Sequence, residues 1–491
     1  MSSIKKLASE TALYGLSSIV GRALNFLLTP VYTRLLIDTG DYGQVTELYA
    51  YAGFLMVVLC YRMETAFFRF GTQADQREQA FATAGRSVFF SVLAIAGLAM
   101  LFSPAIADGL HYSGHPEYIR YFILILTFDC LSELPFARLR LEQRPLRFVA
   151  AKLSGISLNV ILNLFWLLLC PYLDEQGHQW VHQVWSPGYQ VGYIFLANVL
   201  ASALTFLLLS GQLIRIFKSE FNLELWKKMM RYALPLVLVG LAGIANEMLD
   251  RAILTRILPG TIAENRAQLG IYGANYKLAM LITLFTQAYR YAAEPFFFRH
   301  AAEKNALELQ AQVTRWFTIV AAGAVLFILL YLDIIKYFLG VKYHDGLTVV
   351  PILLAANMLL GIYYNFSIWY RLKDRTMTGA WIALSSAILT LVLLLWWVPQ
   401  YGYEGAAWAT LFCYLYLSIA TWFAGRKIYP VPYALGKMAF YLVTPLLLYG
   451  IAEFLRPMTQ DNQVLFWSIR SLLFLGFAAF VWKWEKVKSE F

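Results

Sequence analysis

Residues 379–398, GAWIALSSAILTLVLLLWWV, form an apolar stretch without a charged side chain. A helix of about 20 residues spans the hydrocarbon core of a bilayer, so this stretch is long enough to cross a membrane. Thirteen further predominantly apolar stretches fill most of the chain. They cover 12–36, 44–68, 83–103, 118–137, 149–171, 189–214, 232–257, 270–294, 313–337, 347–370, 402–424, 433–455 and 463–483. The sequence therefore predicts an all-α polytopic membrane protein with 14 transmembrane helices.

The composition supports this class. Of the 491 residues, 59% are hydrophobic and only 14% are charged, and a soluble protein of this length would expose too much apolar surface. The net charge of +10 is spread over short loops, which argues against a nucleic-acid partner. Most of the 40 Lys and Arg residues fall on alternate loops, together with both termini. This asymmetry predicts cytoplasmic termini in a bacterial inner membrane.

Catalytic and metal-binding motifs are not apparent in the sequence. No predicted loop is long enough for a folded extramembrane domain, so we expect no enzyme, including no sugar polymerase or transferase. His111/His115 and His178/His182 give only two ligands each, so we expect no metal site. The four cysteines lie in or beside apolar stretches and are expected to be free thiols. Residues 215–231 mix basic and apolar positions and predict an interfacial helix.

An internal repeat relates the two halves of the chain. Several residues recur 230 positions later: Tyr42, Gly43, Leu48, Tyr61, Glu64, Phe67, Phe68 and Arg69 match Tyr272, Gly273, Leu278, Tyr291, Glu294, Phe297, Phe298 and Arg299. The repeat predicts two parallel six-helix lobes, at 1–217 and 218–428, followed by two additional helices at 429–491. Transporters are often built from such repeats, with the substrate path between the lobes.

These features resemble the MOP flippase superfamily. The resemblance rests on the two six-helix lobes, the basic end of helix 2, and Pro30, Arg34-Leu35-Leu36 and Tyr42-Gly43 at the first external turn. The two additional helices are more similar to the polysaccharide-exporter and lipid II flippase branches than to the twelve-helix drug-efflux branch. The resemblance implies a V-shaped transporter that moves a polyprenyl-pyrophosphate-linked sugar across the inner membrane.

The resemblance also implies a set of pyrophosphate-binding arginines. The lipid II branch uses arginines in helices 1, 2 and 8, and this chain has Arg22, Arg62 and Arg290 in those helices. Charged groups inside a membrane are costly, so each arginine is expected to face a cavity or a partner. Two polar stripes carry them, one formed by Gly15, Ser18, Arg22, Asn25 and Thr29, the other by Thr283, Gln287, Arg290 and Glu294. Asn25 and Gln287 are therefore candidate substrate ligands. The alternatives are pairing of Arg22 with an acid and of Arg290 with Glu294.

The acidic residues inside the predicted spans leave alternatives open. Asp129 and Glu133 lie one turn apart and could bind Na⁺, carry protons, or neutralise the arginines. Glu64 and Glu294 belong to a duplicated pattern. A single substrate group need not be bound twice, so we interpret this pattern mainly as a cytoplasmic gate or a helix anchor.

Predicted helix 7 carries a second charged cluster. Glu247, Asp250 and Arg251 lie close together, and Glu247 can pair with Arg251. Asp250 and Lys277 lie at similar depth in an antiparallel hairpin, which predicts a bridge or an extracytoplasmic gate. Ion binding at Glu247 or Asp250 is the alternative.

The sequence-based hypothesis is a flippase that moves a polyprenyl-pyrophosphate-linked oligosaccharide, a surface-polysaccharide precursor, to the outer leaflet by alternating access. A lipid II flippase and a cation-coupled drug exporter are the rival interpretations. We expect no cofactor, with Na⁺ or H⁺ as possible coupling ions. The expected partners are the glycolipid, membrane lipid and polysaccharide assembly proteins.

Overall fold

The computed structural model describes residues 19–73, 76–301, 303–459 and 461–486. Within these ranges all regular structure is helical and no strand occurs, which confirms the all-α prediction. The chain divides into two compact units, Met1–Gly273 and Ala274–Phe491. The lobe boundaries expected from the repeat stay a prediction.

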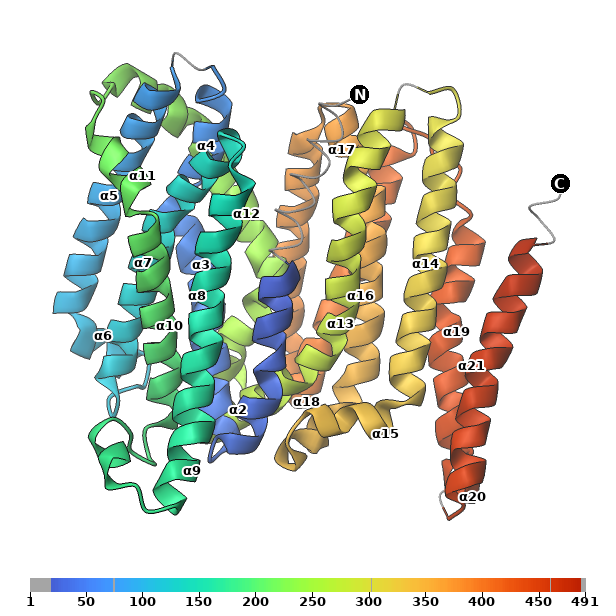
Figure 1. Ribbon diagram of the computed structural model, residues 1–491. Helices are drawn as coiled ribbons and strands as arrows, with labels where there is room; N and C mark the ends of the chain where they lie inside the picture. Colours follow the sequence, from blue (N-terminus) through green and yellow to red (C-terminus); the bar gives the residue numbers. More distant parts are fainter. Residues whose placement is uncertain (1–18, 74–75, 302, 460, 487–491) are drawn as a thin grey trace. The chain divides into compact units, whose positions relative to one another are not determined.

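The first unit is built around α7, which packs against α5, α10 and α3 (Figure 1). Residues 19–27 are also helical and precede α2. The helices of this unit are α2 (Thr29–Leu35), α3 (Thr39–Cys60), α4 (Met63–Phe70), α5 (Arg77–Leu101), α6 (Ser103–Gly109), α7 (Pro116–Leu141), α8 (Pro145–Leu164), the π-helical turn η1 (Phe165–Leu169), α9 (Cys170–Glu175), η2 (Gln179–Gln183), α10 (Gln190–Leu208), α11 (Ser210–Leu213), η3 (Ile214–Phe217) and α12 (Leu223–Ile257).

The long helix α13 (Ile262–His300) begins in the first unit and continues into the second. Thr261 and Glu264 form a capping box at its start, with the Thr261 amide and hydroxyl both donating to Glu264. These hydrogen bonds lower the pKa of the Glu264 carboxyl, because they favour its charged form.

The second unit contains α14, which packs against α16, α19 and α21. Its helices are α14 (Ala306–Leu330), α15 (Leu332–Ile335), η4 (Lys336–Phe338), η5 (Val341–Thr348), α16 (Val349–Phe366), α17 (Ile368–Leu372), α18 (Thr376–Gly425), α19 (Leu435–Phe454), α20 (Arg456–Thr459) and α21 (Gln463–Lys486).

The helices have the length and polarity of membrane spans. Ten helices in the described residues are long and apolar enough to cross a bilayer. Each of the 14 expected stretches overlaps a helix, and α18 covers two of them. Gly402 divides α18, with φ 61° and ψ −147°, a conformation that a residue with a side chain would adopt only under strain. A multi-pass membrane protein follows, whereas the number of 14 crossings stays a prediction.

Residues 215–231 do not form a separate interfacial helix, so that prediction is wrong. η3 ends at Phe217, and the Asn222 side chain caps α12, which continues to Ile257. The connection is fixed by Arg86 of α5, which donates to the carbonyl oxygens of Ile216, Phe217 and Ser219. Arg86 thereby replaces the helical hydrogen bonds that these carbonyl groups lack.

The duplicated Tyr-Gly pattern marks a close crossing of α3 and α13. A Cβ atom at Gly43 would lie 2.0 Å from the carbonyl oxygen of Arg266. A Cβ atom at Gly270 would lie 1.9 Å from the carbonyl oxygen of Thr39, and one at Gly273 would lie 2.8 Å from the Thr46 hydroxyl. Small residues at membrane helix crossings let the backbones approach in this way.

Two clusters of ion pairs join α14, α19 and α21 at opposite ends. At one end Arg470 of α21 is almost completely buried and donates to the Leu330 carbonyl oxygen and to Glu453, with Asp333 3.2 Å away. At the other end Glu485 of α21 accepts from Lys437 and Tyr441 of α19 and lies 3.4 Å from Arg315 of α14. The two additional helices are therefore fixed to α14 by buried charges.

Candidate functional site

A break between α3 and α4 determines the position of Arg62. Tyr61 and Arg62 have φ values of 30° and 55°, in the left-handed region that residues with side chains rarely adopt. Such conformations cost about 1–3 kcal/mol each and are enriched at functional sites. His111, Gln143 and Asp374 adopt them as well. The Tyr61 hydroxyl lies 2.7 Å from Ser87 of α5 and holds the break in place. In the second copy of the repeat, α13 continues through the corresponding positions without a break. The left-handed break at Tyr61 and Arg62 is therefore a feature of the first copy and not of the second.

The guanidinium group of Arg62 lies on Gly240 of α12. A Cβ atom at Gly240 would lie 2.5 Å from Nη2 of Arg62. Nη1 is 3.7 Å from Glu64, and about a third of the Arg62 side chain stays exposed. The arginine is thus partly paired and still accessible.

Arg22 and Asn25 both lie exposed on the helical segment 19–27. Gly21 packs this segment on Ile156 of α8. Gly15 and Ser18 of the predicted stripe lie outside the described residues, and Thr29 is buried rather than exposed. Only part of the predicted stripe is therefore accessible.

Asp129 and Glu133 are half-buried on α7, in two different environments. Asp129 is within hydrogen-bonding reach of Ser202 on α10. Glu133 lies near the negative charge of Glu64 and near the positive charges of Arg140, Lys152 and Arg62. Neutralisation of the arginines by these acids stays a prediction. Ion coupling by these two acids stays a prediction.

Lys152 of α8 and Arg140 of α7 are two candidates that the sequence analysis did not single out. Arg140 lies between two predicted spans and Lys152 near the start of the predicted span 149–171, and both were counted among the basic residues of the cytoplasmic loop at this position. The charge of Arg22 also acts on Lys152. Four basic side chains of the first unit, Arg22, Arg62, Arg140 and Lys152, thus lie near the acids Glu64 and Glu133. Such a group of basic residues suits an anion.

In the second unit Arg290 and Arg371 share one acid, Glu294. Arg290 pairs with Glu294 at i, i+4, as one of the alternatives predicted, and its guanidinium lies 3.8 Å from the centre of the Tyr364 ring. Arg371, at the end of α17, lies 2.9 Å from the other carboxylate oxygen. Arg371 was missed because it was assigned to a basic loop. Gln287 is half-buried, and Thr283 donates to Asn357 of α16.

The duplicated acids therefore pair with arginines that are not duplicated. Glu64 lies beside Arg62 and Glu294 beside Arg290, whereas Arg69 stacks on Tyr232. A gating role for Glu64 and Glu294 stays a prediction.

The predicted cluster on helix 7 is arranged around Asp250. Asp250 is buried and accepts from the Tyr272 hydroxyl and from Arg251. Arg251 also contacts the main-chain carbonyl oxygen of Glu247, whose side chain is exposed. Asp250 and Lys277 lie in different compact units, and their bridge stays a prediction.

A buried ion pair between Glu47 and Arg266 lies near the crossing of α3 and α13. Oε1 of Glu47 accepts from Thr255 (2.5 Å) and Tyr51 (3.1 Å), and Oε2 accepts from Tyr112 (2.8 Å) and Arg266 (3.3 Å). The sequence analysis missed this pair because Arg266 was counted with an external loop. Its complete set of partners indicates a structural role.

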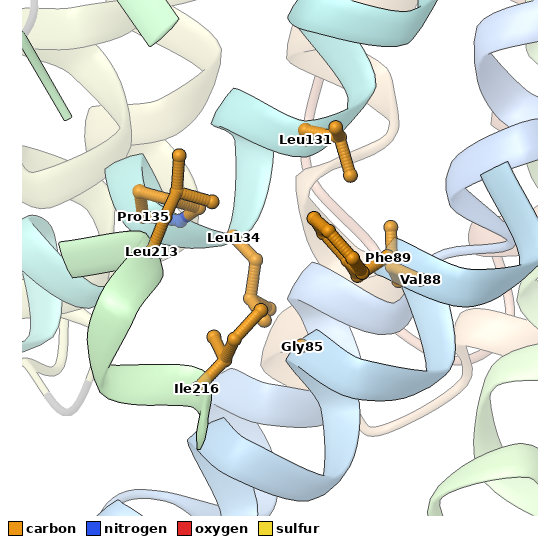
Figure 2. A pocket seen from close by; sticks show the side chains of 8 residues that line it. All are labelled: Gly85, Val88, Phe89, Leu131, Leu134, Pro135, Leu213 and Ile216. Atoms are coloured by element: carbon orange, nitrogen blue, oxygen red, sulfur yellow. The ribbon is translucent and has the colours of Figure 1, made fainter. Parts of the chain in front are cut away.

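A small hollow between α5, α7 and the segment 213–216 is lined by residues without polar side chains (Figure 2). It encloses about 220 Å³ including its open mouth. Its lining residues are Gly85, Val88, Phe89, Leu131, Leu134, Pro135, Leu213 and Ile216. It therefore does not account for recognition of a charged substrate.

Comparison with solved structures shows which known fold the chain has. The chain is similar to "Lipid II flippase MurJ, inward closed conformation" (12% identity, 96% of this chain and 99% of that chain, TM-score 0.70). It is also similar to an inward-facing multidrug resistance MATE family transporter of the MOP superfamily (14%, 82% and 94%, 0.66). A third similar structure is the Vibrio cholerae MATE transporter VcmN in the bent form (13%, 90% and 100%, 0.55). The fold is that of MOP superfamily transporters, as the sequence predicted.

Residues 7–301 match the family model described as "Polysaccharide biosynthesis protein". The match covers more than half of the chain, so the chain belongs to this family. No curated protein sequence matches it. The chain is thus a multi-pass membrane protein of a polysaccharide biosynthesis family, with the fold of the MOP superfamily transporters to which it is similar.

Proposed function

We propose that the chain flips a polyprenyl-pyrophosphate-linked oligosaccharide from the cytoplasmic to the outer leaflet of a bacterial inner membrane. The family match over residues 7–301 carries this proposal, because it connects the transporter fold with polysaccharide biosynthesis. Both termini would be cytoplasmic, as the distribution of Lys and Arg predicts. Alternating access would expose the head group first to one side and then to the other.

The accessible arginines supply the chemistry that a pyrophosphate requires. Arg22 is exposed, and Arg62 and Arg290 each retain about a third of their side-chain exposure beside an acid. A guanidinium group stays charged at any relevant pH and offers paired N–H donors to phosphate oxygens. We propose that these three arginines bind the pyrophosphate, with Asn25 and Gln287 as further ligands of the head group.

A lipid II flippase is the second candidate. The likeness to MurJ over 96% of this chain favours it. Both candidates use a polyprenyl-pyrophosphate carrier, and they differ in the glycan and its peptide. A cation-coupled drug exporter is less well supported, because a group of basic residues repels cationic drugs.

Reconstitution into liposomes tests the three candidates. The purified protein would receive a polyprenyl-pyrophosphate oligosaccharide, lipid II or a fluorescent cationic drug, and translocation would be followed by head-group accessibility. Faster flipping of the oligosaccharide lipid than in empty liposomes supports the proposal. Transport of lipid II alone, or of the drug alone, would overturn it in favour of the corresponding rival.

The driving force is proposed to be a Na⁺ or H⁺ gradient acting through Asp129 and Glu133. The alternative gating and ion-binding residues are Glu247, Asp250, Arg251, Lys277, Glu64 and Glu294. Imposing each gradient separately on the liposomes would identify the ion. Polysaccharide assembly proteins are the proposed partners.

Replacing Gly240 with alanine is expected to reduce flipping about tenfold without unfolding the protein. The new methyl group would occupy the position of the Arg62 guanidinium, which is the mobile end of a long side chain and must move. Gly243→Ala is the matched control, because a Cβ atom at Gly243 meets no neighbour within 4 Å. Both changes add one methyl group to α12 and favour the helix. Equal flipping rates in the two variants would show that the position of Arg62 is irrelevant to transport.

A further inference from the structure

Glu294 is bound by a different guanidinium group at each of its two carboxylate oxygens. Oε1 accepts from Nε (3.2 Å) and Nη2 (3.0 Å) of Arg290, and Oε2 accepts from Nη1 of Arg371 (2.9 Å). The two arginines come from α13 and α17, so a single acid joins two helices. The three groups together carry one net positive charge.

The exposure of this cluster distinguishes it from a packing contact. The side chains of Arg290, Glu294 and Arg371 are 34%, 28% and 40% exposed. Glu485 has a similar arrangement, between Lys437 and Arg315, but is only 2% exposed. The cluster at Glu294 is therefore open at the surface of the second unit, whereas Glu485 is closed.

The accessibility of both arginines also distinguishes this cluster from the one at Glu453. Arg456 and Arg470 bridge Glu453 and also bind Asp333, which pairs with Lys336 as well, but Arg470 is only 2% exposed. At Glu294 both arginines are partly exposed, and the two of them face one acid. A ligand with more negative charge than a carboxylate would therefore be attracted to the two arginines more strongly than Glu294 is.

We propose that Glu294 occupies the place of a phosphate, and that Arg290 and Arg371 together bind the diphosphate of the substrate when Glu294 moves away. This inference rests on the proposed function and deepens it, because it adds Arg371 to the ligands and gives Glu294 the role of an internal competitor.

The geometry fits an exchange of ligands. A phosphate group offers two oxygens at nearly the separation found in a carboxylate, so the same donors can bind either group. Contact with the face of Tyr364 fixes the plane of the Arg290 guanidinium, which keeps its donors directed at one place. Because Glu294 stays nearby, it can return to the arginines and release the diphosphate. Transport needs such release as much as it needs binding.

Binding measurements on the purified full-length protein test the exchange. The probes are geranylgeranyl diphosphate, which has a lipid tail, and inorganic diphosphate, which has none. Glu294→Gln is expected to tighten binding of both probes about tenfold, because the competing negative charge is gone. Arg371→Gln is expected to weaken binding about tenfold. Arg371→Lys, which keeps the charge without the planar donors, should bind with intermediate affinity.

Glu485→Gln is the matched control, because it neutralises an acid between two basic groups that a ligand cannot reach. It is expected to lower thermal stability and to leave diphosphate affinity unchanged. Glu294→Asp provides a second test should the glutamine variant fail to fold. Its shorter side chain cannot reach both arginines, so binding should again tighten.

The outcomes separate this inference from the function on which it rests. If Glu294→Gln binds diphosphate no more tightly than the wild type, or if Arg371→Gln keeps full affinity, the exchange is refuted. If those variants behave like the wild type while Arg62→Gln loses affinity, the proposed function survives without the exchange. Failure of the wild-type protein to bind either probe would overturn both.

Discussion

Replacing Glu47 with alanine is expected to lower the free energy of unfolding by about 3–5 kcal/mol. Glu47 is 2% exposed and accepts from Arg266 and from the hydroxyls of Thr255 and Tyr112. Without the carboxylate, the Arg266 charge would be left buried with only the carbonyl oxygens of Leu110 and His111 as hydrogen-bond partners among the contacts described. Thermal unfolding in detergent, followed by circular dichroism, would measure the loss.

Two further variants separate charge from packing. Glu47→Leu combined with Arg266→Met removes both charges and should cost less than Glu47→Ala alone, because no buried ion loses its partner. Glu224→Ala removes one member of an exposed pair with Lys227 and should change stability by less than about 1 kcal/mol. A Glu47→Ala protein as stable as Glu224→Ala would contradict the role of this ion pair.

Replacing Arg22 with alanine is expected to abolish flipping of the oligosaccharide lipid while leaving the amount of folded protein unchanged. Arg22 is exposed and lies near Lys152, in the group of basic residues of the first unit. Among the described residues no hydrogen bond or ion pair of Arg22 to a buried group is found, so its removal should affect transport of the substrate rather than the fold. Head-group accessibility in liposomes measures flipping, and gel filtration measures folding.

Arg147→Ala provides the control for loss of one surface charge, because Arg147 is an exposed arginine at the start of α8. It should retain nearly all transport. Normal flipping by Arg22→Ala would remove Arg22 from the proposed set of pyrophosphate ligands. Equal losses in both variants would point to general attraction of anions rather than to a specific contact.

The sequence predicted the fold well because the membrane imposes simple rules. A long apolar stretch in a membrane must form a helix so that its backbone groups are hydrogen-bonded, and each expected stretch overlaps a helix. The asymmetry of Lys and Arg predicts only the orientation of these helices. The 215–231 segment was assigned wrongly because its mixture of basic and apolar residues fits both a surface helix and the first turns of α12. The structure of this segment depends on the contacts of Asn222 and Arg86, and a periodic pattern of residues does not reveal these contacts.

The candidate site was predicted only in part, because pairing depends on three-dimensional position. Sequence spacing anticipated the pairing of Arg290 with Glu294, which are one helical turn apart. Sequence spacing could not predict the contact between Arg371 and Glu294, because 77 residues separate them. It could not predict the left-handed break at Tyr61 and Arg62 either, because glycine and proline, the usual signals of a break, are absent from both positions.

The charges that join α14 to α19 and α21 have a consequence for shortened forms of the chain. A protein ending before α19 would leave Arg315 without Glu485, and Asp333 with Lys336 alone of its three basic partners. Loss of these partners at both ends of α14 is expected to destabilise such a truncation rather than yield a simpler twelve-helix carrier. The last two helices are therefore integral to the protein and cannot be regarded as a detachable appendage.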